Sequence, residues 1–247
     1  MSTFVLVHGS WHGAWCWDKV VPLLQNAGHR VVAIDLPGHG LDTMPVQEIT
    51  LQDYTDRLCS VLDNETEQVI LVGHSSGGLA ITQTAEYRPD KIRTLVYLCA
   101  YLPQDGQSLL QVIQSELMVP AVAAPPSAVV ISDDQTYMSL DGDRVKANLY
   151  GDCSDEDVEF AKDRLCLDPM ATFLAPVQLT PQNFGSVPRV YIETLQDIAI
   201  SIGLQRQMYG QSPCREVITM DTAHSPFFSQ PEALSQHLHH IAETSID

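Results

Sequence analysis

The chain has 247 residues, and its composition and charge exclude several classes of protein. Hydrophobic residues make up 45% of it, which is usual for a globular protein and ample for a buried core. The formal net charge is −18, so we expect no nucleic-acid partner and no anionic membrane surface as a partner. No apolar run approaches the roughly 18 residues of a membrane span, so we expect no transmembrane helix.

The N-terminus and the cysteines bear on the cellular compartment. Met1 is followed almost directly by an apolar strand, without the basic region and cleavage site of a signal peptide. The cysteines are scattered, without a CxxC pair or metal-ligand spacing, at Cys16, Cys59, Cys99, Cys153, Cys166 and Cys214. We therefore expect free thiols in a reducing cytoplasm and no bound metal.

The first hundred residues alternate predicted strands and helices. The strands are short apolar runs typical of burial on both faces, and Gly28 and Pro89 mark helix ends. In chain order we expect a strand at Phe4–Val7, a helix at Trp15–Ala27, a strand at Arg30–Ile34, a helix from its cap Thr50 to about Asn64, a strand at Gln68–Val72, a helix from Ser76 to about Tyr87 and a strand at Ile92–Leu98. This alternation predicts an α/β fold, with a mainly parallel sheet covered by helices on both faces.

The alternation breaks between residues 101 and 186, a stretch rich in Pro, Ala and Asp without a strong strand. It contains helical candidates at Leu109–Leu117, Gly142–Tyr150 and Asp155–Leu165, the last capped by Ser154. The pattern resumes with a strand at Arg189–Thr194, a helix at Ala199–Tyr209, a strand at Glu216–Met220 and a helix at Glu232–Thr244. We interpret the chain as a single domain, with a core of residues 1–100 and 187–247 and an inserted helical lid at about 101–186.

A G-x-S-x-G pentapeptide, Gly73-His74-Ser75-Ser76-Gly77, lies between a predicted strand and a predicted helix. In such a sharp turn the central serine projects from the carboxyl edge of the sheet, and the small flanking residues let the backbone crowd there. The following helix directs its N-terminal N–H groups at the site, where they favour negative charge. We therefore expect Ser75 to be a catalytic nucleophile. Ser76 is expected to offer only its backbone N–H.

A serine nucleophile needs a base, and the chain has nine histidines. His224 is the best candidate, because it lies between the last predicted strand and the closing helix and therefore at the same sheet edge as Ser75. We expect structural or solvated roles for the others: His8, His12, His39 and His74 near the rim, His29 in a surface turn, and His237, His239 and His240 on the closing helix.

The base in turn needs a carboxylate that orients it. Asp197 follows the strand Arg189–Thr194, and Ser75, Asp197 and His224 then occur in the chain order of a nucleophile-elbow hydrolase. Three alternatives are less favoured. Asp221 is very near His224 in sequence, Glu193 should lie within a strand, and Asp168 is in the lid.

An oxyanion hole should form between the elbow and the loop after the first strand. Gly9 allows close approach of the backbone, and the backbone N–H groups of Ser10 and Ser76 are the expected donors. The Ser10 hydroxyl is an alternative participant.

Several segments together resemble the plant methylesterase and hydroxynitrile lyase group of α/β-hydrolases and its bacterial esterase relatives. They are Val7-His-Gly-Ser-Trp-His-Gly-Ala-Trp-Cys-Trp, Asp35-Leu-Pro-Gly-His-Gly, the elbow, and Tyr191-Ile-Glu-Thr-Leu-Gln-Asp197. The resemblance implies an α/β-hydrolase fold with about six parallel strands, no cofactor, and a lid-covered hydrophobic pocket for a small ester.

Two positions favour an esterase over a lyase within this group. One lineage of hydroxynitrile lyases has a threonine at the position of Gly9 and a lysine at the position of Ser225, and another has an asparagine in the loop of Gly9. We therefore predict a serine carboxylesterase acting on a small, largely apolar ester. A hydroxynitrile lyase and a small-ligand sensor with weak hydrolase activity remain the alternatives.

The candidates for the pocket lining are the lid residues Leu109, Leu117, Met118 and Phe173. The sequence leaves the oligomeric state open, with a homodimer as one option.

Overall fold

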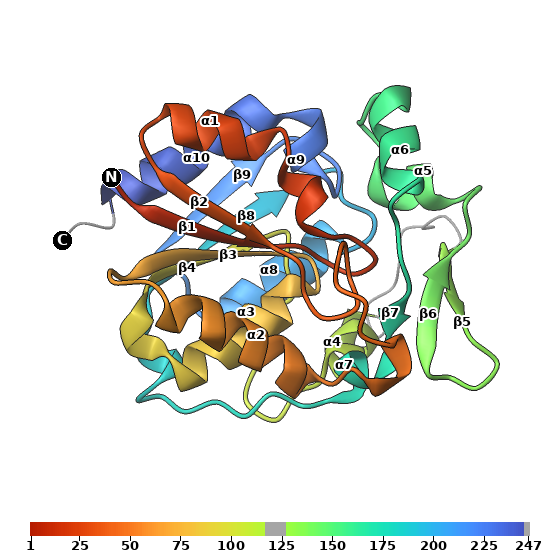
Figure 1. Cartoon of the computed structure of the whole chain (residues 1–247), viewed down its shortest axis with the longest axis horizontal. Helices are drawn as coiled ribbons and strands as arrows, with labels where there is room; N and C mark the ends of the chain where they lie inside the picture. Colours follow the sequence, from red (N-terminus) through yellow and green to blue (C-terminus); the bar gives the residue numbers. More distant parts are fainter. Residues whose placement is uncertain (117–126, 245–247) are drawn as a thin grey trace.

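The computed structural model describes residues 1–116 and 127–244 and is organised around a six-stranded parallel sheet (Figure 1). The sheet consists of β1 (Thr3–Val7), β2 (Arg30–Ile34), β3 (Val69–His74), β4 (Ile92–Leu98), β8 (Arg189–Thr194) and β9 (Glu216–Met220). Their spatial order is β2-β1-β3-β4-β8-β9, and each neighbouring pair is parallel. The predicted α/β fold with about six parallel strands is confirmed. The central position of β3 and β4 explains their nearly continuous apolar sequence, because both of their faces are buried.

Helices cover both faces of the sheet. Figure 1 shows α1 (Val20–Asn26) and α10 (Pro231–Thr244) on one face, and α2 (Leu51–Asp63) and α3 (Gly77–Tyr87) on the other. The remaining core helices are α8 (Ile202–Gln211), the short α9 (Pro226–Ser229), and the 3-10 turns η1 (Ala14–Trp17), η2 (Val46–Glu48), η3 (Pro89–Lys91) and η4 (Phe184–Ser186). Among the residues described, no helix combines the length and the apolar content needed to cross a bilayer.

Two of the predicted helices had different outcomes. Thr50 caps α2 as predicted, and a reciprocal capping box with Asp53 satisfies two backbone N–H groups of the first turn. The helix predicted at Trp15–Ala27 is instead divided into η1 and α1. Pro22 explains the division. In a continuous helix its ring would clash with the carbonyl of residue 18, and because proline has no backbone N–H, it could not form the hydrogen bond to that carbonyl.

The segment between β4 and β8, which the sequence predicts to be a lid and which is called the lid below, contains helices and a small sheet. Its helices are α4 (Leu109–Glu116), α5 (Val145–Leu149), α6 (Asp155–Lys162) and α7 (Met170–Leu174), and Ser154 caps α6 as predicted. An antiparallel sheet that the composition did not predict is formed by β5 (Val129–Ile131), β6 (Tyr137–Leu140) and β7 (Asp168–Pro169). Strands of two to four residues are too short to show a recognisable alternation of polar and apolar positions.

The lid lies beyond the carboxyl edge of the central sheet. In Figure 1 the six central strands run from the side of the molecule where the N-terminus lies towards the side of β5, β6 and β7, where α5 and α6 also lie. Because all six central strands are parallel, the loops that follow β1, β2, β3, β8 and β9 meet at this edge. Any site built from these loops is therefore adjacent to the lid.

Candidate active site

Ser75 lies in a strained turn between β3 and α3. Its φ is +52°, a left-handed conformation that is costly for a residue with a side chain. The turn depends on the flanking glycines, since a Cβ on Gly73 would lie 2.9 Å from the Gly77 carbonyl carbon, and one on Gly77 only 2.5 Å from the His8 oxygen. The Ser75 backbone N–H donates to Leu98 O (3.3 Å), which ties the turn to the end of β4. The predicted elbow is therefore present, with Ser75 at its tip.

His224 and Asp197 are brought together by the loops after β9 and β8. The His224 Nδ1 lies 2.7 Å from Asp197 Oδ2, and both residues are buried. The other carboxylate oxygen, Oδ1, accepts the backbone N–H groups of Ala199 (2.8 Å) and Ile200 (2.9 Å). The carboxylate is thereby oriented towards the ring and holds a proton on Nδ1, an arrangement in which Nε2 would be able to act as a base.

The three alternative carboxylates are engaged elsewhere. Asp221 accepts a hydrogen bond from the Gln196 side chain (2.9 Å) on an exposed loop. Glu193 is held by Arg206, Tyr209 and Thr219. Asp168 bonds to His39 (2.9 Å). Among the described carboxylates that were candidates, Asp197 is the one paired with His224.

The backbone of His224 is held by two further side chains. His74 Nε2 donates to the His224 carbonyl (2.8 Å), and the Cys99 thiol contacts the same oxygen (3.4 Å). Burial is the main cause that holds the pKa of His74 well below its ordinary value, so its ring stays neutral. His74 thus links the elbow directly to His224. The sequence offered no signal for the role of Cys99.

Ligand atoms of His74, Cys99 and His224 lie within 4.8 Å of one another, which makes them a metal-ligand candidate in the described part of the chain. The same side chains already bond to the His224 carbonyl and to Asp197. We therefore assign this cluster to the positioning of His224.

The loop after β1 lies directly against the elbow. A Cβ on Gly9 would be 2.7 Å from Ser75 Cβ, and the Ser10 hydroxyl donates to Ser76 Oγ (2.8 Å). His8 Nδ1 donates to Gly9 O (2.8 Å) and its Nε2 accepts from Leu36 N–H (3.1 Å). Burial, followed by repulsion from His39, holds the pKa of His8 well below its ordinary value. Ser10 and Ser76, the two predicted backbone donors, are thus neighbours at the elbow.

Two of the candidate pocket residues are buried next to the core, namely Leu109 and Phe173. Leu117 and Met118 lie outside the described residues. The predicted pocket lining therefore stays a prediction.

Comparison with known proteins agrees with this architecture. A model of the alpha/beta hydrolase family matches residues 4–237. The chain is 38% identical to putative methylesterase 11, chloroplastic, of Arabidopsis thaliana, over 98% of this chain, and it spans 64% of that relative's length. It is 34% identical to methylesterase 9 of the same plant, covering 98% of this chain and 99% of the relative.

A solved structure shows the same overall fold. The crystal structure of polyneuridine aldehyde esterase aligns with a TM-score of 0.87 at 29% identity, covering 98% of this chain and 99% of that chain. The family match, the curated relatives and this structural similarity establish that the chain belongs to the alpha/beta hydrolase family.

Proposed function

We propose that this protein is a serine carboxylesterase that hydrolyses a small, largely apolar ester through an acyl-enzyme intermediate. The observation that carries the proposal is the buried 2.7 Å contact between His224 Nδ1 and Asp197, at the same sheet edge as the strained Ser75. Curated relatives named as methylesterases support an ester substrate, and our preferred substrate is a methyl ester, which releases methanol. No cofactor is needed for this chemistry.

In the proposed reaction, the Ser75 hydroxyl attacks the ester carbonyl carbon while His224 Nε2 takes its proton. Backbone N–H groups of Ser10 and Ser76 bind the oxygen that becomes negative, and Asp197 stabilises the imidazolium. The tetrahedral intermediate collapses when His224 returns the proton to the leaving alcohol. A water molecule, deprotonated by His224, then attacks the acyl-serine, and release of the acid regenerates Ser75.

The lyase alternative is less favoured at two positions. A side chain at Gly9, as the lyases have, would collide with Ser75, since even a Cβ there lies 2.7 Å from Ser75 Cβ. Ser225 is buried and carries no positive charge that could stabilise cyanide. Release of cyanide from a cyanohydrin would identify a lyase, and tight ligand binding without turnover would identify a sensor.

We place the enzyme in the cytoplasm, with a small-molecule ester as its partner and without a nucleic-acid or membrane partner. All six cysteines are free thiols, which suits a reducing compartment. A homodimer remains one option for its oligomeric state.

The first experiment measures hydrolysis of methyl esters and p-nitrophenyl esters of increasing acyl length by wild type and Ser75→Ala. We expect wild type to turn over the short apolar esters and Ser75→Ala to lose about 10⁴-fold or more in kcat. Ser60→Ala, which changes an exposed serine on α2, is the matched control and should retain full activity. Equal activity of Ser75→Ala and wild type would refute the proposal.

A further inference from the structure

The loop that carries Ser10 is conformationally strained. Trp11, the next residue, has a φ of +62°, which is unusual for a bulky side chain, and it is largely buried. A backbone in this region persists only where its surroundings hold it. Because the Ser10 N–H is a proposed oxyanion donor, the groups that hold this loop also determine the direction of that donor.

The peptide groups on both sides of Ser10 are fixed by buried hydrogen bonds. The preceding carbonyl, Gly9 O, accepts from His8 Nδ1 (2.8 Å) and from the His12 N–H (3.4 Å). The following carbonyl, Ser10 O, accepts from His12 Nδ1 (2.7 Å). Rotation of either peptide would break at least one of these bonds, and rotation of the first would turn the Ser10 N–H away from the elbow.

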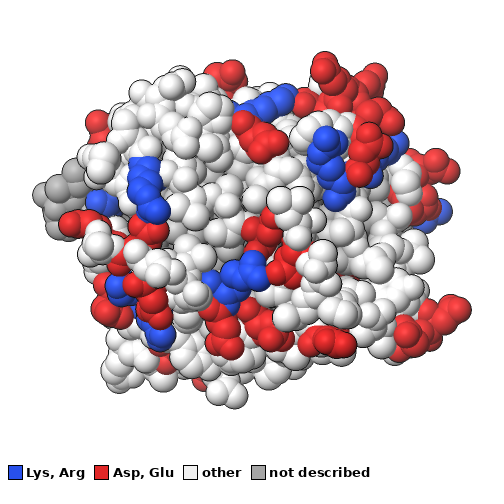
Figure 2. Space-filling view, in the orientation of Figure 1, with Lys and Arg blue, Asp and Glu red and all other residues white. Residues whose placement is uncertain are grey.

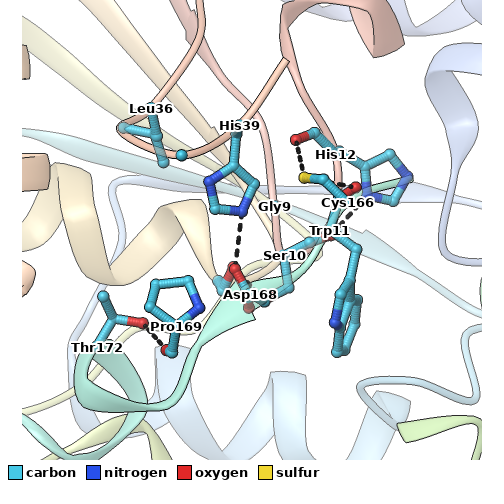
Figure 3. A network of polar contacts seen from close by, with 12 residues as sticks. Gly9, Ser10, Trp11, His12, Leu36, His39, Cys166, Asp168, Pro169 and Thr172 are labelled. Atoms are coloured by element: carbon cyan, nitrogen blue, oxygen red, sulfur yellow. Dashed lines mark hydrogen bonds and ion pairs between the residues drawn. The ribbon is translucent and has the colours of Figure 1, made fainter. Parts of the chain in front are cut away.

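The lid completes this network. The Tyr150 hydroxyl, at the end of α5, lies 2.6 Å from His12 Nε2, and both side chains are buried. Cys166, which precedes β7, donates its backbone N–H to Trp11 O (3.0 Å), and Figure 3 shows it beside His12 and Trp11. Two lid residues therefore contact the strained loop directly.

The protonation states fix the direction of each bond. Burial is the main cause that lowers the pKa of His12 to about 4, so the ring is neutral near pH 7. Since Nδ1 donates to the Ser10 carbonyl, Nε2 has no proton and must accept from Tyr150. Burial also raises the pKa of Tyr150, so its hydroxyl remains a donor.

We propose that Tyr150 and His12 are positioning residues that hold the loop from Gly9 to Trp11 in the conformation that presents the Ser10 N–H to the oxyanion. In this arrangement the lid is part of the catalytic apparatus and does more than cover the substrate. The proposal rests on the esterase function, since it concerns the donor used in that reaction.

The test compares Tyr150→Phe, His12→Asn and the double variant with wild type on the best ester of the panel. We expect kcat to fall about 10-fold in Tyr150→Phe with KM within about 2-fold, because a misplaced oxyanion donor weakens transition-state binding more than ground-state binding. The asparagine amide can still donate to Ser10 O but offers Tyr150 no imidazole acceptor. The kcat of the double variant should therefore be little lower than that of Tyr150→Phe alone.

An inhibitor pair separates positioning from a general loss of structure. A trifluoromethyl ketone forms a tetrahedral adduct with the serine and needs the oxyanion donors, whereas the matching methyl ketone binds as a ground-state analogue. In Tyr150→Phe the inhibition constant of the first should rise about 10-fold while that of the second stays unchanged. Tyr137→Phe changes another lid tyrosine, on β6, and should behave like wild type in every assay.

The outcomes are distinguishable. A wild type without ester turnover would overturn both the esterase function and the positioning role. Turnover that Ser75→Ala abolishes but Tyr150→Phe leaves unchanged would overturn the positioning role alone. Equal weakening of both ketones in Tyr150→Phe, together with a lower melting temperature than Tyr137→Phe, would also overturn it in favour of a structural role.

Discussion

Gly9 lies at a point of close approach between the elbow and the loop after β1. A methyl group there would lie 2.7 Å from Ser75 Cβ and 3.0 Å from His74 Nδ1, and neither atom is the end of a flexible side chain. We predict that Gly9→Ala displaces Ser75 or the loop and lowers kcat/KM by about 100-fold, because such reactions depend on sub-ångström placement. Steady-state kinetics on a p-nitrophenyl ester, with thermal unfolding as a check on folding, measures this effect.

Gly142→Ala is the matched control for this residue. Its added methyl would meet no atom within 4 Å, and the position lies in the lid between β6 and α5. It should keep the activity of wild type. Full activity of Gly9→Ala would mean that the close contact between the loop and the elbow is unimportant for catalysis.

At the scale of elements, β7 in the lid is joined to the loop after β2 by a buried pair of side chains (Figure 3). His39 Nε2 lies 2.9 Å from Asp168 Oδ1, and both side chains are almost fully buried. Burial lowers the pKa of His39, but the hydrogen bond and the charge of Asp168 outweigh it, so the net pKa lies above the ordinary value. The other titratable groups nearby are His8, His12, Asp35, Tyr54 and Cys166.

This pair predicts a pH-dependent contribution to stability. A raised folded-state pKa means that protonated His39 stabilises the fold fully below the unfolded value of about 6.5, and that this contribution is lost as pH rises through the folded pKa. We expect Asp168→Asn to lower the free energy of unfolding by about 2–4 kcal/mol at pH 5.5 and by clearly less at pH 8.5. Urea denaturation at the two pH values measures the difference.

Asp133→Asn serves as the control for this pair, because it removes one exposed negative charge from the same lid. It should change stability little at either pH. If Asp168→Asn destabilised the protein equally at pH 5.5 and pH 8.5, protonation of His39 would have no part in holding β7.

At the scale of the whole molecule, negative charge dominates. The sequence has 31 acidic and 13 basic side chains, so at least 18 carboxylates have no Lys or Arg of their own. Figure 2 shows acidic side chains at many places on the visible face, with fewer basic ones between them. Such an excess destabilises the compact state through self-repulsion, and salt screens that repulsion.

We therefore predict that the melting temperature at pH 7.5 rises by roughly 3–6 °C between 10 mM and 300 mM NaCl, since the Debye length shrinks well below the spacing of many surface charges. Differential scanning calorimetry measures the shift. The same salt step at pH 5.5, nearer the isoelectric point of about 4.6, should give a smaller rise. A melting temperature that is independent of salt at pH 7.5 would show that the charges are locally compensated.

The sequence by itself determined most of the central sheet and the candidate chemistry. The boundaries predicted for Arg30–Ile34, Ile92–Leu98, Arg189–Thr194 and Glu216–Met220 agree with the structure. These strands could be predicted because each is a short run of mostly apolar or β-branched residues, which is a local property. The elbow could also be predicted, because its glycines and serine lie within five consecutive residues of the chain.

Only the tertiary structure decided which distant residues meet. The pairing of His224 with Asp197, in place of Asp221 or Glu193, depends on where two loops converge at the sheet edge. The contact of Tyr150 with His12 joins residues 138 positions apart, and the lid strands exist only through their pairing with each other. Such contacts are set by packing between elements, which leaves no periodic pattern in the sequence. Chain order had favoured Asp197 as the partner of His224, whereas the lid contacts became visible only in the structure.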